Sequence, residues 1–427
     1  MPKSASTATS PRATSPTLRP APGGPPVGAR IAWLLGPALV AGVAYLDPGN
    51  VASNMTAGAR YGYLLVWVVV IGNVMAWLIQ YLSAKLGIVT GQSLPEVLGE
   101  RLRNRWGRRA YWVQAELVAM ATDIAEVIGG AVALNLLFGL PLLWGGAITG
   151  AISIALLVLQ SRRGPRTFEF VVMAMVLIIA VGFVFGVFVV PPDPAGIVAG
   201  LVPRFEGTDS VLLAASILGA TIMPHAIYAH SALARDRFRA SEHSTPRLLR
   251  ATRWDVTIAM AVAGTVNLCI LLLAAAALAG VPGTDSLEGA YAALRDGIGP
   301  LVATLFAVGL LASGLASTAV GAYAGAEIMH GLLRVRIPLI ARRLVTLIPA
   351  LAILAIGADP TGALILSQVV LSFGIPFALI PLVALTAQER TLGRYRNRVG
   401  TTIAGVAASV FLITLNGVLL WLVFTGG

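Results

Sequence analysis

Apolar residues fill most of the chain from Ile31 onward, in long runs that short polar segments separate. A helix needs about 20 apolar residues to cross the roughly 30 Å of hydrocarbon in a bilayer. The pattern therefore predicts an all-α membrane protein with eleven transmembrane helices. We expect these at about 31–58, 62–88, 110–138, 141–160, 167–190, 210–233, 254–280, 299–331, 338–357, 360–387 and 401–425.

The positions of Lys and Arg support the same count. These residues gather in cytoplasmic loops, and eleven spans that start from a cytoplasmic N-terminus place all but three of the 30 basic residues inside. The exceptions are Arg60, Arg204 and Arg295. A missed span would invert every later loop and spoil this division. We therefore expect a multi-pass protein of the plasma (inner) membrane, with its N-terminus in the cytoplasm and its C-terminus outside.

Composition narrows the class further. The chain is 57% hydrophobic and 11% charged, whereas a soluble domain has roughly 25% charged residues. Its net charge of +11 would suit nucleic acid only if the basic side chains shared one face, and they are dispersed between apolar runs. Residues 1–30 are rich in Pro, Ser, Thr and Ala and lack the features of a signal peptide. They predict a disordered cytoplasmic tail before a membrane domain at 31–427.

Two of the spans are interrupted by polar and helix-breaking residues. The first contains Asp-Pro-Gly-Asn at 47–50, and the sixth contains Met-Pro-His at 223–225. A proline inside a helix costs about 3 kcal/mol, and unwound backbone at membrane depth survives only where protein buries it or where it lines a cavity. We expect both helices to break there, at Pro48, Gly49 and Pro224.

The broken spans also suggest an internal duplication. Spans one and six are the first members of two five-helix sets, and because five is odd the second set enters from the opposite side. We expect inverted repeats at about 31–190 and 210–387, followed by an eleventh helix at about 401–425. In this arrangement the substrate binds between the broken helices near the membrane midplane.

The residues at the breaks could bind a metal ion. A carboxylate in the bilayer costs roughly 2.5 to 3.5 kcal/mol and needs a partner, and no Lys or Arg stands at the depth of Asp47 in a neighbouring span. Asn50 adds an amide oxygen, and unwinding frees a carbonyl near Ala44. Span six can add the thioether of Met223 and the carbonyl of Ala220. This mixture suits Mn²⁺, Fe²⁺, Co²⁺ or Cd²⁺ better than Ca²⁺.

Simpler roles exist for both key residues. Asp47 could serve only as the N-cap of the helix that begins at Pro48. Met223 could serve only as packing, which is the usual role of an isolated methionine in a membrane helix. Asp47 and Met223 together favour the metal site, because each lies at the break of its own span.

A group of acidic, basic and histidine residues suggests a proton route. The third span holds three acids, of which Asp123 and Glu126 lie one turn apart on the same helical face. Intramembrane acids usually mark an ion or proton path, and histidine exchanges protons near neutral pH. The alternative is a buried salt-bridge network that only fixes helix packing. The candidate residues are Glu116, Asp123, Glu126, His225, His230, Arg342 and Arg343.

The two interrupted spans carry a family resemblance. The sequence resembles the Nramp family of proton-coupled divalent-metal transporters, whose signatures Asp-Pro-Gly-Asn and Met-Pro-His stand at 47–50 and 223–225. The similarity runs from about Gly36 to the last span and looks close to the bacterial manganese-uptake branch. It implies a leucine-transporter-like fold.

The resemblance also implies roles for single residues. Metal binding passes to Asp47, Asn50 and Met223 with the carbonyl of Ala220, and Gln368 in the tenth span joins in some conformations. The implied proton relay comprises Asp47, Asp123, Glu126, His225 and Arg343. The eighth span departs from the family pattern Ala-Gly-Gln-x-x-Met-x-Gly-Phe, because residues 324–332 read Ala-Gly-Ala-Glu-Ile-Met-His-Gly-Leu. The departure concerns gating by that helix and leaves the metal site unchanged.

The sequence therefore predicts a secondary active transporter that imports divalent transition metals, Mn²⁺ first, together with protons. Metal and proton are its substrates, and we expect no resident cofactor and no obligate protein partner. The chain has neither a His-Glu-x-x-His motif nor a P-loop, so we expect no enzyme. The alternative is a sodium-coupled organic-solute symporter of the same fold, of the amino-acid type. Such sites usually present helix N-termini and small residues to an anionic group.

Overall fold

The computed structural model describes residues 36–425 except 164, 240 and 336. The predicted N-terminal tail lies outside these residues. Every regular element within them is a helix, so the all-α prediction is confirmed. Seven helices in the described part are long and apolar enough to cross a membrane, and the count of eleven spans remains a prediction.

Helices correspond to each expected span, and short additional helices lie between them. The first half contains α2 (Pro37–Val43), η1 (Ala44–Leu46), α3 (Pro48–Tyr61), α4 (Val66–Thr90), α5 (Leu94–Arg101), α6 (Arg105–Phe138), α7 (Leu142–Arg163), α8 (Pro165–Val189) and α9 (Pro194–Gly200). The second half contains α10 (Gly207–Ile222), α11 (Pro224–Phe238), α12 (Thr245–Ala277), α13 (Leu287–Gly297), α14 (Pro300–Leu333), α15 (Leu339–Ala355), α16 (Pro360–Ala387), α17 (Glu389–Leu392), η2 (Gly393–Tyr395) and α18 (Val399–Thr425).

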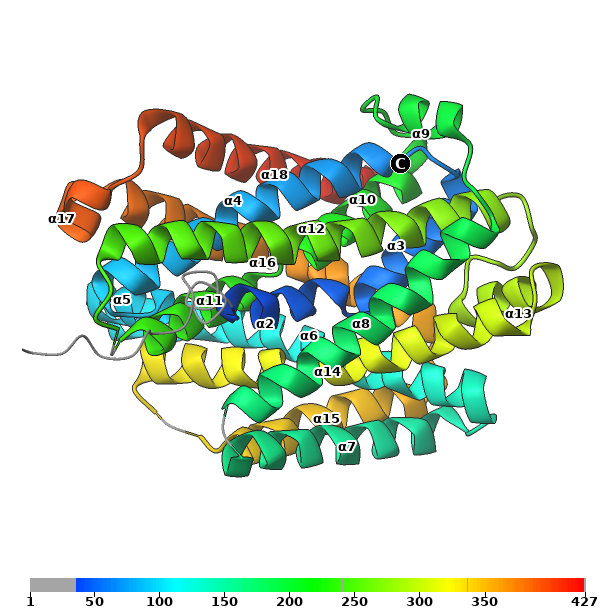
Figure 1. The fold of residues 1–427 in the computed structure, drawn as a ribbon, viewed down its shortest axis with the longest axis horizontal. Helices are drawn as coiled ribbons and strands as arrows, with labels where there is room; N and C mark the ends of the chain where they lie inside the picture. Colours follow the sequence, from blue (N-terminus) through cyan, green and yellow to red (C-terminus); the bar gives the residue numbers. More distant parts are fainter. Residues whose placement is uncertain (1–35, 164, 240, 336, 426–427) are drawn as a thin grey trace, which may run out of the picture.

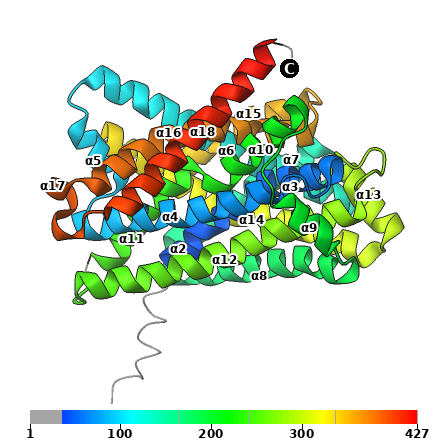
Figure 2. The same cartoon turned by 90° about the horizontal axis from the view of Figure 1, so that it is seen from above.

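The loops lie at two opposite ends of the molecule. Both views place α5 and α17 at one end and α13 at the other (Figures 1 and 2). At the α5 end, Arg101 donates to Gln388 at 2.8 Å. At the α13 end, Arg60 donates to Asp285 at 2.7 Å. Loops predicted to lie inside thus meet at one end, and loops predicted to lie outside meet at the other.

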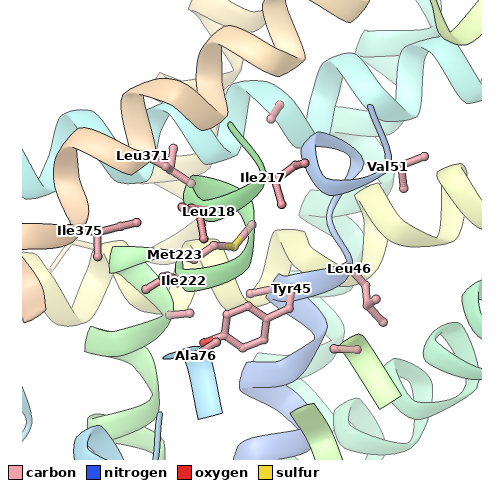
Figure 3. Packing of buried hydrophobic residues seen from close by; sticks show 14 of the residues in the cluster. Tyr45, Leu46, Val51, Ala76, Ile217, Leu218, Ile222, Met223, Leu371 and Ile375 are labelled. Atoms are coloured by element: carbon pink, nitrogen blue, oxygen red, sulfur yellow. The ribbon is translucent and has the colours of Figure 1, made fainter. Parts of the chain in front are cut away.

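The broken helices lie in the middle of the helix bundle. α3 packs against α12 and α10, and α10 packs against α16. Figure 3 shows Tyr45 and Leu46 of the first break and Met223 of the second within one buried cluster, with Leu371 of α16 beside them. This packing brings together segments that are far apart in the sequence, and it creates the candidate site.

Candidate metal centre

The first break has the geometry that its sequence predicts. η1 ends at Leu46, Asp47 is extended with φ −71° and ψ 164°, and α3 begins at Pro48. Proline suits the first position of a helix because it has no N–H to leave unpaired there. The carbonyl of Ala44 accepts a hydrogen bond from the Asp47 amide at 3.3 Å. The turn therefore engages the Ala44 carbonyl, which sequence reasoning expected to be freed.

The second break is centred on Met223. α10 ends at Ile222, α11 begins at Pro224, and the methionine between them has a φ of 28°. A non-glycine residue in this left-handed region costs about 1 to 3 kcal/mol and persists only where its surroundings impose it. The Met223 side chain is fully buried. Figure 3 shows it between the turn of α10 and the segment that carries Tyr45 and Leu46.

Hydrogen bonds join the polar residues of the two breaks to α16. One oxygen of the Asp47 carboxylate accepts from the main-chain and side-chain amides of Asn50 at 2.8 and 2.9 Å. The other accepts from the Gln368 amide at 3.0 Å. Asn50 also donates to the carbonyl of Ala220 at 2.9 Å. Asp47, Asn50, Ala220 and Gln368 therefore form one buried cluster, and Met223 follows the last turn of α10 beside them.

The cluster carries a charge and free acceptors. Asp47 caps α3, but the cap uses only one carboxylate oxygen, and within the described residues no basic side chain pairs with it. The amide oxygens of Asn50 and Gln368 are buried without a hydrogen-bond partner. Buried acceptors left unpaired cost about 1 to 3 kcal/mol each. A bound cation would satisfy both amide oxygens and the carboxylate, which capping alone does not.

Two glycines allow Gln368 to enter this cluster. A methyl group on Gly219 would lie 1.9 Å from the main-chain oxygen of Gln368, so α16 approaches α10 where there is no side chain. A methyl group on Gly49 would lie 1.8 Å from the side-chain nitrogen of Gln368. Backbone packs this closely only at glycine.

The predicted proton residues of α6 and α15 form one ion-pair network. Arg342 contacts Glu116 at 3.0 Å and Asp123 at 2.8 Å. Arg343 contacts Asp123 at 3.0 Å and Glu126 at 3.1 Å. All of these side chains except Glu116 are buried, and one oxygen of Glu126 has no hydrogen-bond partner. The helix of the acids also packs against the first break one turn beyond Glu126, where Gly129 lies against Pro48.

The two histidines belong to different groups. The Nδ1 atom of His225 lies 3.2 Å from the hydroxyl of Thr122, the residue before Asp123 on α6. The other ring nitrogen of His225 has no hydrogen-bond partner. His230 lies 2.7 Å from the side-chain oxygen of Gln80 on α4. The Gln80 amide in turn donates to the Tyr45 hydroxyl. His225 thus lies against α6, the helix that carries the acids, whereas His230 links α11 to α4 and η1.

Sequence reasoning missed two sets of functional candidates. The first is Gln80, which is buried in the structure. An amide side chain within the apolar second span was the signal in the sequence that could have found it. The other is a cluster at the α5 end, where ligand atoms of Glu96, Glu327 and His330 lie within 4.8 Å of one another. Arg235 contacts both glutamates, with Glu327 at 2.7 Å, so a guanidinium already balances their charge. The residues of α14 in this cluster belong to the segment that departs from the family pattern.

Broken helices around a buried carboxylate define the class as a membrane transporter of leucine-transporter-like fold. The family model for "Natural resistance-associated macrophage protein-like" matches residues 38–422, and the chain belongs to this Nramp family. It is 59% identical to the "Divalent metal cation transporter MntH" of Mycobacterium tuberculosis over 92% of each chain. It is 46% identical to the protein of that name from Bacillus subtilis over 90% of each.

Solved structures agree with the family assignment. The Eremococcus coleocola manganese transporter matches with a TM-score of 0.82 and 32% identity, over 93% of this chain and 87% of that one. The nucleobase-cation-symport-1 family transporter Mhp1 matches with a TM-score of 0.57 and 15% identity, over 92% of this chain and 93% of that one. The second likeness concerns the fold alone. The chain is thus a multi-pass membrane transporter and not an enzyme.

Proposed function

We propose that this protein imports divalent transition-metal ions, Mn²⁺ first among them, together with protons across the bacterial inner membrane. The observation that carries the proposal is the buried carboxylate of Asp47, which lacks a basic partner among the described residues and lies beside two unpaired amide oxygens. Met223 adds a thioether, which favours borderline and soft metals over Mg²⁺ and Ca²⁺. The relatives named for divalent metal and manganese transport support the same choice of substrate.

A cavity at the α13 end supports metal entry from that side. It has a volume of about 310 Å³, and Thr56, Leu213 and Ile365 line it. These residues lie on α3, α10 and α16, the helices that carry Asn50, Ala220 and Gln368. Between the cavity and the site, the hydroxyls of Ser53 and Ser216 are hydrogen-bonded at 2.6 Å. The cavity thus stands directly over the candidate metal centre.

The charge of this cavity favours cations. Its lining includes three carboxylates and one guanidinium, from Asp209, Asp285, Asp359 and Arg60. The lining therefore has a net negative charge, and such a cleft raises the local concentration of cations. The α13 end then faces outside and the basic α5 end faces the cytoplasm, which puts the N-terminus inside and the C-terminus outside.

We also assign residues 31–190 and 210–387 to inverted repeats.

Protons would move through the network beside the metal centre. Arg343 of α15 joins Asp123 and Glu126 of α6, and His225 of α11 lies beside Thr122 on the same helix as these acids. α6 packs against the first break at Pro48, the residue after Asp47. Acidic and histidine side chains near a binding site can release their protons when a cation binds there, because the cation favours their deprotonated forms. The sodium-coupled organic-solute alternative is not favoured, because the site holds a carboxylate and a thioether.

Uptake by purified protein in proteoliposomes tests the proposal. Wild-type protein should accumulate Mn²⁺ and acidify the vesicle lumen, and excess Fe²⁺ or Cd²⁺ should compete better than Mg²⁺ or Ca²⁺. Asp47→Ala should remove uptake. Asp193→Ala is the matched control, because Asp193 is an exposed N-cap on α9, at the outer end in the proposed orientation. Near-normal uptake by Asp47→Ala, or sodium-driven uptake of an amino acid, would overturn the assignment.

A further inference from the structure

A cavity at the opposite end of the molecule is lined by arginines and by apolar residues. It has a volume of about 650 Å³ and lies at the start of α18. Figure 1 shows α17 and the start of α18 at one edge of the molecule. Three arginines line it from the segment that links α17 to α18. The lining includes Arg394, Arg396, Arg398, Val399, Thr402 and Ile403.

The cavity has an excess of positive charge. Arg396 pairs with Glu389 at 2.8 Å, and both side chains are exposed. Arg394 lies over the ring of Tyr395 and donates to its hydroxyl. Within the described residues no carboxylate pairs with Arg394 or Arg398. Two guanidinium groups are therefore available to an anion, and a guanidinium binds phosphate through paired hydrogen bonds.

The arginine segment is fixed in place rather than loosely attached. Asn397, between two of the arginines, is buried and donates from its main chain and side chain to Thr386 of α16, at 2.9 and 2.8 Å. Its side-chain oxygen accepts from Lys85 of α4 at 2.9 Å. These bonds hold the loop against two helices, so Arg398, directly after Asn397, and Arg394, three positions before it, extend from a segment that is fixed in place.

An apolar face of α18 leads away from the arginines. Val399, Ile403, Val406 and Val410 follow one another at helical spacing and are 77%, 63%, 50% and 56% exposed. In a membrane protein such a face lies against acyl chains. Positive charge at the head of an exposed apolar stripe is complementary to a lipid that carries a phosphate on hydrocarbon tails.

We propose that this cavity binds an anionic phospholipid, with its phosphate between Arg394 and Arg398 and its acyl chains along the apolar face of α18. The lipid would brace α18 against α16. Those helices are already joined by Ser372 and Asn416, which exchange hydrogen bonds at 2.8 and 3.0 Å. Ser372 lies one turn beyond Gln368, so the brace acts on the helix that supplies an amide to the metal centre.

Native mass spectrometry of the full chain in neutral detergent tests this site. Dioleoyl phosphatidylglycerol should bind the wild type in preference to dioleoyl phosphatidylcholine. Arg394→Gln combined with Arg398→Gln should weaken phosphatidylglycerol binding by about tenfold or more, since each basic residue near a membrane surface contributes about 1 kcal/mol. Arg103→Gln combined with Arg105→Gln removes the same charge from the exposed segment at the start of α6, and this variant should bind the lipid normally.

Two further arms separate a lipid from a free anion. Inorganic phosphate and dihexanoyl phosphatidylglycerol offer the same phosphate with no chains or short ones, and both should compete poorly with the dioleoyl lipid. Unchanged binding by the Arg394 and Arg398 variant, an equal loss in the control variant, or full competition by inorganic phosphate would overturn the proposal. Thermal unfolding without added lipid should be the same for all three proteins. The readout does not depend on metal transport, so it stands apart from the proposed function.

Discussion

Replacing Gly49 with alanine should displace Gln368 from the metal centre while Asp47, Asn50 and Met223 stay unsubstituted. The new methyl group would lie 1.8, 2.4 and 2.7 Å from three atoms of the Gln368 side chain. The α16 backbone is held by its close approach to Gly219, so the glutamine side chain must rotate. Its hydrogen bond to Asp47, now 3.0 Å long, would then be broken.

That bond holds the Gln368 amide in the site, so losing it also withdraws the unpaired Gln368 oxygen from a bound cation, and the strength of the bond sets the scale of the effect. A hydrogen bond to a charged group contributes about 1.5 to 3 kcal/mol, which corresponds to about ten- to 150-fold in an equilibrium constant. Gly49→Ala should therefore weaken Mn²⁺ binding by roughly tenfold or more, measured by calorimetry on purified protein and by initial uptake rates in proteoliposomes. Gly417→Ala is the matched control, because a methyl group there meets no atom within 4 Å.

A double mutant tests whether the effect passes through Gln368. If Gly49→Ala acts by moving that side chain, it should add little, less than about 0.5 kcal/mol, once Gln368→Ala is already present. Full additivity of the two substitutions would refute the reasoning. Wild-type Mn²⁺ affinity in Gly49→Ala would refute it as well, since the two side chains cannot share the space.

Three other substitutions test the remaining parts of the account. Met223→Ala should lower Cd²⁺ affinity roughly tenfold, about 1.4 kcal/mol, and let Ca²⁺ compete better with labelled Mn²⁺ uptake; an unchanged competition pattern would leave the thioether as packing. Asp123→Asn should flatten the pH dependence of uptake more than it changes Mn²⁺ affinity, and unaltered proton influx would make the acid network purely structural. The hydrogen bond from Arg60 holds the pKa of Asp285 below its usual range. That pair therefore persists at neutral and mildly acidic pH and is lost only as pH falls through the lowered pKa. Asp285→Asn should raise the KM for Mn²⁺ about two- to fivefold by weakening the field of the outer cavity, and a changed pH profile would contradict this.

The helix breaks were predictable because their causes are local. A proline inside an apolar span interrupts the hydrogen bonds of a helix. Both helices break at the prolines where the sequence predicts a break. The pairing of Arg342 and Arg343 with the acids of α6 was also foreseeable, because buried charges need partners. Apart from this pairing, local rules predicted the positions of single helices and not which distant segments pack together.

Contacts between distant segments were not predictable in the same way. His230 was expected in the proton route, but its partner Gln80 comes from 150 positions earlier in the chain. Arg235 reaches Glu96 and Glu327 across 139 and 92 positions. No pattern of hydrophobic and polar residues encodes such pairings, which depend on how the helices pack. The Ala44 carbonyl differs from its prediction for a local reason, because the turn of η1 brings the Asp47 amide to it at 3.3 Å.

The metal should bind at Asp47, between the two helix breaks, and anomalous diffraction can locate it there. Crystals of the wild-type protein grown with MnCl₂ and measured at the manganese absorption edge would locate the ion without reference to transport. One strong anomalous peak is expected in contact with Asp47, Asn50 and Met223. A peak at the Glu96, Glu327 and His330 cluster, with none at Asp47, would contradict it.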